Sequence, residues 1–327
     1  MVTNNPEIQS VNLYRLYGLT LASDFPFQNN IPAGSGAPDV RFSSVRTPPV
    51  RNKWQITKPV FTSTVRTDSG EPLLSIYRMK RYDVVYFAPQ IIFYLWPGEI
   101  IAEVLHPSYE HIVEIRFLGE ILSLWLELHG VPALHASAVV MEGEAIGFVS
   151  TNKGGKSALA ATMILKGCPL LTDDILPLEV CDGIATARPG YPQMRMWPDE
   201  ADFFIGSHES LEIVHPWYTK FRIPIGERGF GRFCYEKKPL KALYFLQRLD
   251  GNDPITIEPV SPSNAFIELV AHSFSAHIVE ALGLQVQRMN FFASLIRSIP
   301  IRRVTYPSGF QNLSRVGDAL LADLKNL

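Results

Sequence analysis

One short loop decides the fold, and it reads Ser150-Thr151-Asn152-Lys153-Gly154-Gly155-Lys156-Ser157. An apolar run ending at Val149 precedes the loop, and a segment rich in Ala, Leu, Met and Ile, which mostly favour helix, follows it. The paired glycines let backbone N–H groups approach an anion closely, and the start of a helix adds unpaired N–H groups. This pattern predicts a strand–loop–helix unit that binds polyphosphate.

Each part of the loop has an expected role in nucleotide binding. Lys156 would reach the β and γ phosphates of ATP, and the Ser157 hydroxyl would ligate Mg²⁺. The standard pattern has glycine where this chain has Ser150, so a solvated loop before a helix is the alternative interpretation. The residues predicted to contact the nucleotide are Ser150, Asn152, Lys153, Gly154, Gly155, Lys156 and Ser157.

Two carboxylates end the next apolar run, which reads Leu170-Leu171-Thr172-Asp173-Asp174. At the end of a strand beside the loop, such carboxylates can face the same metal ion and phosphate. Adjacent aspartates also commonly mark a turn or a helix cap, which is the structural alternative. His135 lies in the apolar strand before the loop, where a lone histidine is more often a core residue, but a nearby carboxylate such as Asp173 would orient its ring.

These features together resemble the core of the HPr kinase/phosphorylase family, whose fold is shared with phosphoenolpyruvate carboxykinase. The resemblance covers residues 131–190. It implies that Asp173 is the base toward a serine hydroxyl and that Asp174 helps to hold Mg²⁺. His135 and Lys156 would complete the catalytic cluster.

A narrower resemblance comes from the flanking segments 14–24 and 189–198. They are similar to the HPr-kinase-like proteins encoded with lasso-peptide biosynthesis, which phosphorylate a serine of a ribosomal peptide, often its C-terminal one. The resemblance implies ATP and Mg²⁺ as cofactors, a peptide or small protein with an acceptor serine as partner, and assembly as a homo-oligomer. The family usually has a glutamate where this chain has Ala158, so one of the family's metal contacts is not expected here. The arginine-rich signature of its bifunctional members is not evident, so phosphorolysis is not expected.

Chain length and patterning predict two domains within a mixed α/β fold. The chain has 327 residues, enough to bury a sizeable core. Residues 1–108 alternate β-type runs, the first at residues 11–21, with turns, and predict a β-rich domain that is either a packing module or a platform for a peptide. Residues 109–327 are predicted to begin with a helix over 109–129 and to form the kinase domain, for which the resemblance implies an HPr kinase/phosphoenolpyruvate carboxykinase-like P-loop core.

Charge and cysteine content exclude several classes of protein. A net charge of −2 leaves no electrostatic footprint for nucleic acid or an anionic membrane, so neither partner is expected. The three cysteines are too few and too scattered for a disulfide framework or a zinc cage, which favours a reducing, cytoplasmic location. Neither a secretory signal nor an apolar stretch of about 18 residues is evident, so the chain is expected to be soluble.

Three basic residues downstream are predicted to contact the transferred phosphate or the acceptor: Arg195, Lys220 and Arg222. The alternatives are a surface salt bridge for Arg195 and a solvated face for the basic segment 218–238, which is expected to be loop-like. Beyond it, the runs 240–249 and 255–260 are predicted to pair as strands about a turn.

The function predicted from these observations is that of an ATP-dependent serine kinase acting on a peptide or small protein, in a narrower form on the C-terminal serine of a lasso precursor peptide. Two alternatives stay open. One is a small-molecule kinase or carboxykinase on the same scaffold, and the other is a non-catalytic nucleotide-binding module.

Overall fold

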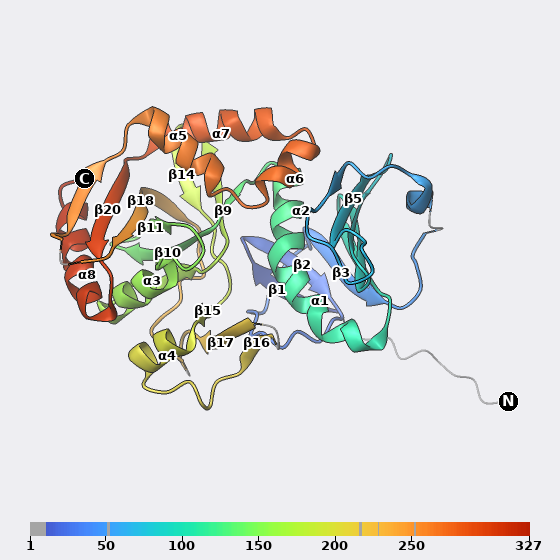
Figure 1. Cartoon of the computed structure of the whole chain (residues 1–327), viewed down its shortest axis with the longest axis horizontal. Coiled ribbons are helices and arrows are strands. Elements are labelled where there is room, and N and C mark those ends of the chain that lie inside the picture. The colour runs from blue at the N-terminus through green and yellow to red at the C-terminus, as the bar shows by residue number, and fades with distance from the viewer. Residues whose placement is uncertain (1–10, 51–52, 216–217, 228, 252) are drawn as a thin grey trace. The chain divides into compact units, whose positions relative to one another are not determined.

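The chain forms two compact units. The computed structural model describes residues 11–50, 53–215, 218–227, 229–251 and 253–327. The units are Met1–Arg116 and Phe117–Leu327, and the division falls inside the helical stretch 110–128. The domain boundary expected between residues 108 and 109 stays a prediction. Strands and helices are mixed along the chain, which confirms the mixed α/β fold class (Figure 1).

The first unit is built on an eight-stranded sheet in the order β1-β2-β3-β8-β7-β6-β5-β4. Its strands are β1 (Asn12–Leu16), β2 (Leu19–Ser23), β3 (Val40–Val45), β4 (Phe61–Thr62), β5 (Leu74–Arg78), β6 (Asp83–Phe87), β7 (Ile91–Trp96) and β8 (Glu99–Val104). The run expected at residues 11–21 is a hairpin, because Tyr17 and Gly18 turn the chain with φ angles of 51° and 70°. The turns η1 (Lys53–Ile56) and η2 (Pro107–Tyr109) and the helix α1 (Glu110–Arg116) also belong to this unit.

The second unit centres on a nine-stranded sheet, in the order β12-β10-β11-β18-β14-β13-β9, with β20 beside β18 and β19 beside β20. Its strands are β9 (Ala133–Leu134), β10 (Ala136–Met141), β11 (Glu144–Val149), β12 (Leu170–Thr172), β13 (Leu176–Cys181), β14 (Ile184–Ala187), β18 (Lys238–Leu249), β19 (Thr256–Pro259) and β20 (Ile301–Pro307). The strands β11, β18 and β20 run parallel, so their carboxyl ends share one edge of the sheet. The loop at residues 150–155 leaves the sheet at that edge.

Helices cover both faces of this sheet (Figure 1). Alternate residues of β11 belong to two separate cores, as expected for a strand that is buried on both sides. One core includes α3 (Lys156–Leu165) and α8 (Phe310–Leu324), and the other includes α5 (Pro262–Ala271) and α7 (Gln285–Ser298). The second unit also contains η3 (Phe117–Ile121), a π-helical turn, together with α2 (Leu122–Leu128) and α6 (Ala276–Ala281). The helix expected over residues 109–129 is therefore confirmed, with a π-helical turn inside it.

A small sheet of three strands stands beside the main one, with β15 (Gln193–Met196), β17 (Tyr218–Pro224) and β16 (Ile213–His215) in that order. The helix α4 (Pro198–Ile205) packs against β15 and β17. The loop-like conformation expected for residues 218–238 is wrong for residues 218–224, which form the central strand of this sheet. The physical reason is that Ile223 is fully buried in the core beneath α3.

The strand pairing expected between residues 240–249 and 255–260 is also wrong. The strand β20 lies between β18 and β19, parallel to the first and antiparallel to the second. Val304 and Tyr306 of β20 are almost completely buried, whereas β19 is largely exposed. The strand with the larger apolar surface therefore takes the inner position, and β19 is left at the edge.

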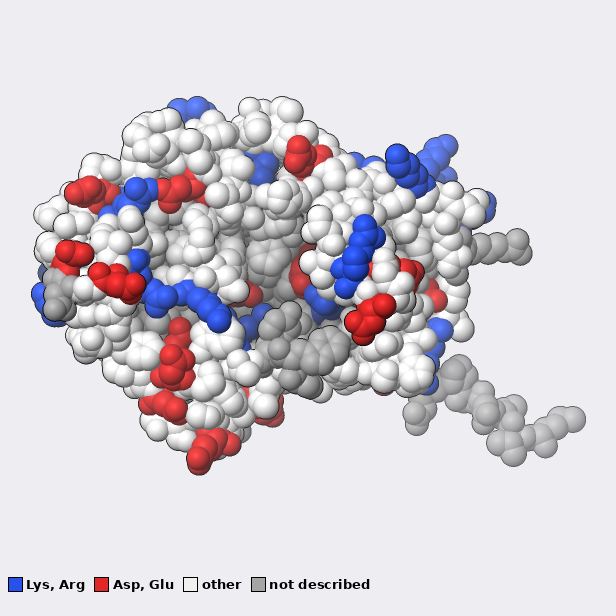
Figure 2. All heavy atoms as spheres, in the orientation of Figure 1, with Lys and Arg blue, Asp and Glu red and all other residues white. Residues whose placement is uncertain are grey.

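None of the helices in the described part of the chain is long and apolar enough to cross a bilayer. On the face shown in Figure 2, basic and acidic side chains are scattered among uncharged ones. This face carries charges of both signs, in keeping with the small net charge of −2.

Candidate functional site

The loop after β11 is closely packed on itself. Gly155 precedes α3 with a left-handed φ of 93°, and a Cβ on Gly154 would collide with Ser150 Oγ. Ser150 is only 3% exposed, so the serine that replaces the usual glycine is accommodated by the absence of a side chain at Gly154. The helix α3 then starts with its N-terminal N–H groups directed toward the loop, which is the arrangement that binds anions.

Lys156 lies inside this loop and is held by it. Its side chain is 7% exposed, and Nζ donates to the carbonyl oxygens of Ser150 at 3.0 Å and Thr151 at 3.1 Å. Burial lowers the pKa of Lys156, and the carboxylates of Asp174 and Asp173 partly oppose that shift. The ammonium group is therefore poised at the loop, with two carbonyl contacts that a phosphate oxygen could replace.

Asp173 is bound to the loop through Ser157. Its Oδ1 accepts hydrogen bonds from Ser157 Oγ at 3.0 Å and from Ser137 Oγ at 2.6 Å. Its Oδ2 accepts the backbone N–H of Arg195 at 3.0 Å. The acidic pair and the end of the loop thus meet, as the sequence pattern requires.

Asp174 faces a different set of partners. Its Oδ2 accepts from Arg195 Nη1 at 3.1 Å, and its Oδ1 lies 3.2 Å from His135 Nδ1. Burial raises the pKa of the Asp174 carboxyl, but the surrounding cations, Arg195 foremost, more than offset this and hold the pKa below its ordinary value. The carboxylate is therefore ionised at neutral pH.

The ring of His135 is oriented by Asp174 and not, as the sequence suggested, by Asp173, whose carboxylate accepts from Ser157 and Ser137. Nδ1 faces both Asp174 Oδ1 and, at 3.1 Å, the Asp174 carbonyl oxygen, so Nδ1 is the nitrogen that carries the proton in the neutral ring. Burial lowers the pKa of His135, which the Asp174 carboxylate only partly opposes. Nε2 of the neutral ring is therefore left as a proton acceptor.

Four of these residues, Lys156, Ser157, Asp174 and His135, line a small pocket that we call the loop cradle. Its lining residues are His135, Asn152, Lys153, Gly154, Gly155, Lys156, Ser157, Asp174, Trp197, Glu200 and Lys220. The ammonium groups of Lys153 and Lys220 lie 4.8 and 5.3 Å from the centre of the Trp197 ring, within range of cation–π attraction. Two further cations are thereby held beside the cradle, in addition to Lys156.

The predicted contact residues are not all brought together. Lys220 lines the cradle and Arg195 pairs with Asp174, whereas Arg222 lies 3.6 Å from Glu212 and donates to the Val214 carbonyl oxygen. Arg222 is not one of the described residues that line the cradle. In an extended strand, residues 220 and 222 project to the same face, so their spacing in the sequence could not predict that they have different partners.

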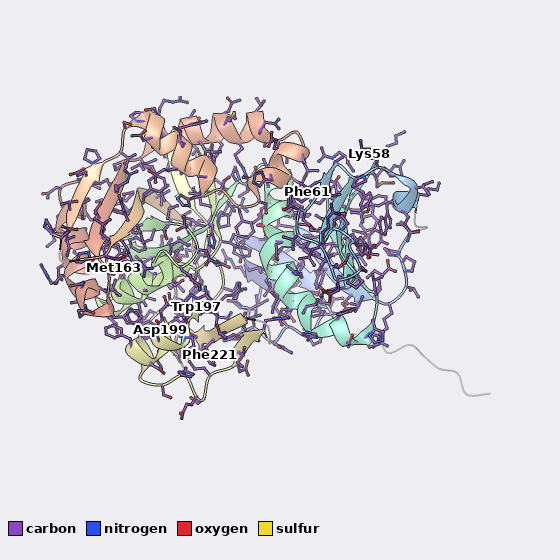
Figure 3. All side chains as sticks on the ribbon, viewed as in Figure 1. Lys58, Phe61, Met163, Trp197, Asp199 and Phe221 are labelled. Carbon is purple, nitrogen blue, oxygen red and sulfur yellow. The ribbon has the colours of Figure 1, made fainter. Side chains whose placement is uncertain are left out.

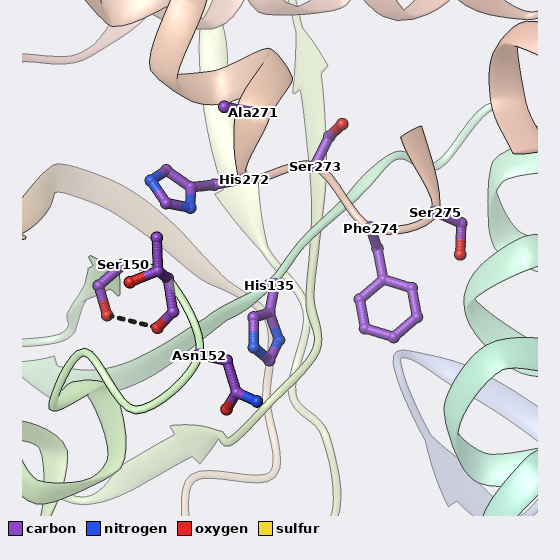
Figure 4. Close-up of a pocket in the computed structure, with 9 residues that line it drawn as sticks. His135, Ser150, Asn152, Ala271, His272, Ser273, Phe274 and Ser275 are labelled. Carbon is purple, nitrogen blue, oxygen red and sulfur yellow. Dashed lines mark hydrogen bonds between the residues drawn. The ribbon is translucent and has the colours of Figure 1, made fainter. Parts of the chain in front are cut away.

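A second, larger pocket adjoins the cradle. This histidine pocket has a volume of about 560 Å³ and is lined by His135, Ser150, Thr151, Asn152, Ala271, His272, Ser273, Phe274 and Ser275. Figure 4 shows His135 and His272 with Phe274 around it. Burial lowers the pKa of His272, and the described lining residues include no Asp, Glu, Lys or Arg. The pocket is therefore an uncharged one that meets the cradle at His135 and Asn152.

Sequence reasoning missed several residues of this site. Trp197 and Glu200 line the cradle from α4 and its start, where Trp197 is labelled in Figure 3. His272 and Phe274 line the histidine pocket from the turn after α5. Trp197 stands inside the flanking segment 189–198 that already carried a resemblance, but nothing local marks the other three as site residues.

The oxygen ligands at the loop fit Mg²⁺ that is bound together with phosphates. Mg²⁺ is usually held by one or two carboxylates, with phosphates and waters completing six ligands. Ser157 Oγ and the carboxylates of Asp173 and Asp174 supply such oxygens. Among the described residues there is no group of three or more His, Cys, Asp or Glu side chains that could hold a metal ion.

Comparison with known proteins gives no match in sequence and a weak likeness in structure. No protein-family model and no curated protein sequence matches the chain. Among solved structures, the chain is similar to the Hpr(Ser) kinase/phosphatase from Coxiella burnetii, with 15% sequence identity over 59% of this chain and 95% of that chain and a TM-score of 0.28. Because that score is low, this likeness says nothing about the function of the chain.

Proposed function

We propose that this protein is an ATP-dependent kinase that transfers the γ-phosphoryl group to a serine hydroxyl of a peptide or small protein. One observation carries the proposal: the 3.0 Å hydrogen bond between Ser157 at the end of the loop and Asp173 of the acidic pair. It supports a single site in which the phosphate-binding loop and the carboxylates act on the same phosphoryl group.

The chain's own residues would position and neutralise the reacting groups. Lys156, the backbone N–H groups of the loop and Lys220 would hold the phosphates, while Ser157 and one aspartate would hold Mg²⁺. Mg²⁺ bound with ATP would supply neutralisation of the phosphate charge. The serine oxygen bonds to the γ-phosphorus, the bond from this phosphorus to the bridging oxygen breaks, and ADP leaves.

The serine proton passes to the acidic pair, and the contacts favour Asp174 as its acceptor. Asp174 lines the cradle and adjoins His135, which also lines the histidine pocket, whereas Asp173 is occupied by Ser157 and Ser137. This division supports Asp174 with His135 on the acceptor side and Asp173 on the metal side. It is the reverse of the division that the family resemblance implies, and the two are separated by experiment.

The histidine pocket supports a peptide as the acceptor. Its volume of about 560 Å³ is that of a ligand site rather than of one side chain, and its uncharged lining with the Phe274 ring suits an uncharged segment of chain. The serine would enter past His135 and meet the phosphoryl group in the cradle. In the narrower form of the proposal, this serine is the C-terminal residue of a lasso precursor peptide.

Transfer of labelled phosphate from ATP to serine-containing peptides tests the proposal. We expect Asp174→Asn to lose transfer by at least about 100-fold while still binding Mg-ATP, and Asp173→Asn to weaken Mg²⁺-dependent ATP binding. Asp182→Asn is a matched control, because Asp182 lies in the exposed β13–β14 turn, and it should behave as wild type.

The opposite pattern, with transfer lost in Asp173→Asn and metal dependence altered in Asp174→Asn, would restore the division implied by the resemblance. Tight binding of Mg-ATP with no transfer to any peptide or small molecule would indicate a nucleotide-binding module instead. Transfer to a metabolite alone would indicate a small-molecule kinase.

A further inference from the structure

A third pocket contacts the C-terminal end of the loop, whereas the histidine pocket contacts its beginning. This third pocket has a volume of about 220 Å³ and is lined by Gly155, Ala158, Asp199, Arg248, Tyr306, Gly309, Phe310 and Leu313. It shares Gly155 with the loop cradle, whereas the histidine pocket contacts the beginning of the loop, at residues 150–152. The two larger pockets therefore contact opposite ends of the same loop, with the cradle between them.

This Tyr306 pocket is formed at the ends of the three parallel strands. Arg248 is near the end of β18, Tyr306 near the end of β20, and Gly155 follows β11. In α/β sheets, ligands bind outside the carboxyl ends of parallel strands. A ligand whose one end lies in the cradle could therefore place its other end in this pocket.

Tyr306 gives an independent indication of a ligand. The residue is 1% exposed, and no described residue hydrogen-bonds its Oη. Burial raises the pKa of Tyr306 to about 12, which Arg248 partly opposes, so the hydroxyl keeps its proton at neutral pH. A Cβ on Gly155 would come within 2.8 Å of Oη, so this hydroxyl lies directly against the loop. A buried hydroxyl without a partner is costly, and a ligand atom at this point would relieve that cost.

The other lining groups suit the uncharged part of a nucleotide. Phe310 presents an aromatic ring to this pocket, and the ring is also stacked on Phe203 with ring centres 4.9 Å apart. Asp199 offers a carboxylate that can accept hydrogen bonds from sugar hydroxyls, and Figure 3 shows it beside Trp197 at the start of α4. Arg248 is anchored to the loop, since Nη2 donates to the Lys153 carbonyl oxygen at 2.6 Å.

We infer that the Tyr306 pocket binds the nucleobase and sugar of the nucleotide whose phosphates lie in the cradle. The base stacks on Phe310, Asp199 accepts from the sugar hydroxyls, and Tyr306 donates to the nucleoside next to Gly155. The volume of about 220 Å³ is below the roughly 300–1,000 Å³ of pockets for whole drug-sized ligands, so it suits this part of the nucleotide alone. The inference rests on the proposed binding of ATP, and it fixes the direction of the nucleotide along the loop.

Calorimetry with two ligands separates the inference from the proposed function. Mg-tripolyphosphate tests the cradle alone, and Mg-ATP tests the cradle with the Tyr306 pocket. We expect wild type to bind Mg-ATP at least about tenfold more tightly, because stacking of one base on an aromatic ring has that magnitude. Phe310→Ala should remove most of this difference and change the affinity for Mg-tripolyphosphate less than about twofold.

Ile205→Ala is the control, because Ile205 lies on the same helix as Phe203, is exposed and is not one of the described lining residues. It should keep the preference for Mg-ATP. Equal binding of both ligands by wild type, or equal weakening of both by Phe310→Ala, overturns the inference and leaves the proposed function standing. Failure of wild type to bind either ligand overturns the proposed function, and the inference with it.

Tyr306→Phe supplies a second test, because it should have opposite effects on nucleotide binding and on the stability of the protein without nucleotide. It should weaken Mg-ATP binding, yet leave unchanged or raise the thermal midpoint of the protein without nucleotide, because it removes a buried hydroxyl that has no protein partner. A lower midpoint without nucleotide, together with unchanged Mg-ATP binding, would assign the hydroxyl a purely structural role and overturn its part in the site.

Discussion

A buried ion pair between α2 and α7 holds the wall of the histidine pocket. The side chains of Arg288 and Glu127 are 6% and 5% exposed, and Arg288 Nη2 lies 2.7 Å from Glu127 Oε2 while Nε donates to Oε1 at 3.0 Å. Arg288 Nη1 also donates to Ser273 Oγ at 2.8 Å, and Ser273 lines the pocket. Replacing Arg288 should therefore affect both the stability of this unit and the acceptor side of the site.

The magnitude follows from the burial of the pair. In Arg288→Met the Glu127 carboxylate stays buried and loses its partner, and breaking a buried pair in this way costs about 3–5 kcal/mol. Replacing both partners by apolar groups of similar size is often neutral or stabilising. We therefore expect the double variant Arg288→Met/Glu127→Met to recover most of the stability that Arg288→Met loses.

Equilibrium unfolding in urea measures this loss, and hydrogen exchange of α2 and α7 assigns it to the second unit, since the chain has two compact units. In transfer assays Arg288→Met should raise KM for the peptide and leave the Kd for Mg-ATP unchanged. A free energy of unfolding within about 0.5 kcal/mol of wild type, or a double variant no more stable than the single one, would refute the reasoning. Unchanged KM would disconnect the pair from the pocket.

Two further predictions concern the cradle itself. Gly155→Ala should lower stability by about 1–3 kcal/mol and weaken Mg-ATP binding, because the left-handed φ of 93° and the nearness of Tyr306 Oη both oppose a Cβ. Adding Tyr306→Phe to this variant should recover part of the lost stability in thermal melts. An unchanged melting midpoint in Gly155→Ala would contradict the strain. In calorimetry, Lys220→Met should weaken Mg-ATP binding by about 1 kcal/mol, and by more at low salt, whereas Arg222→Met should leave it unchanged. Equal effects of the two substitutions would show that the cradle does not distinguish the two cations.

The sequence was sufficient for the features that depend on neighbouring residues. The apolar run, the two glycines and the helix formers after Ser157 all act locally, and they predicted the strand, the loop and α3 correctly. The acidic pair was placed beside the loop because it ends the next apolar run along the chain. In the structure this run is β12, which pairs with β10. The mixed α/β class followed from the same alternation of short elements.

The features that were missed depend on residues far apart in the chain. The position of β20 between β18 and β19 is decided by competition for burial, which no local pattern records. His272 and Phe274 reach the site only because the turn after α5 is hydrogen-bonded to residues 133–135, where His135 N donates to the His272 carbonyl oxygen at 3.0 Å. Their place in the pocket is a consequence of tertiary contacts, so spacing could not reveal it.

The two carboxylates of the acidic pair have different partners, and one backbone angle accounts for this difference. Successive residues of a regular strand face opposite sides, so two adjacent aspartates could not both turn toward the loop. Asp174 has a left-handed φ of 73°, which is uncommon for a residue with a side chain and costs free energy, although aspartate tolerates it better than most residues do. This bend directs Asp173 to Ser157 and Asp174 to His135 and Arg195. The bend is thus what allows one short strand end to serve both the metal side and the acceptor side of the proposed transfer.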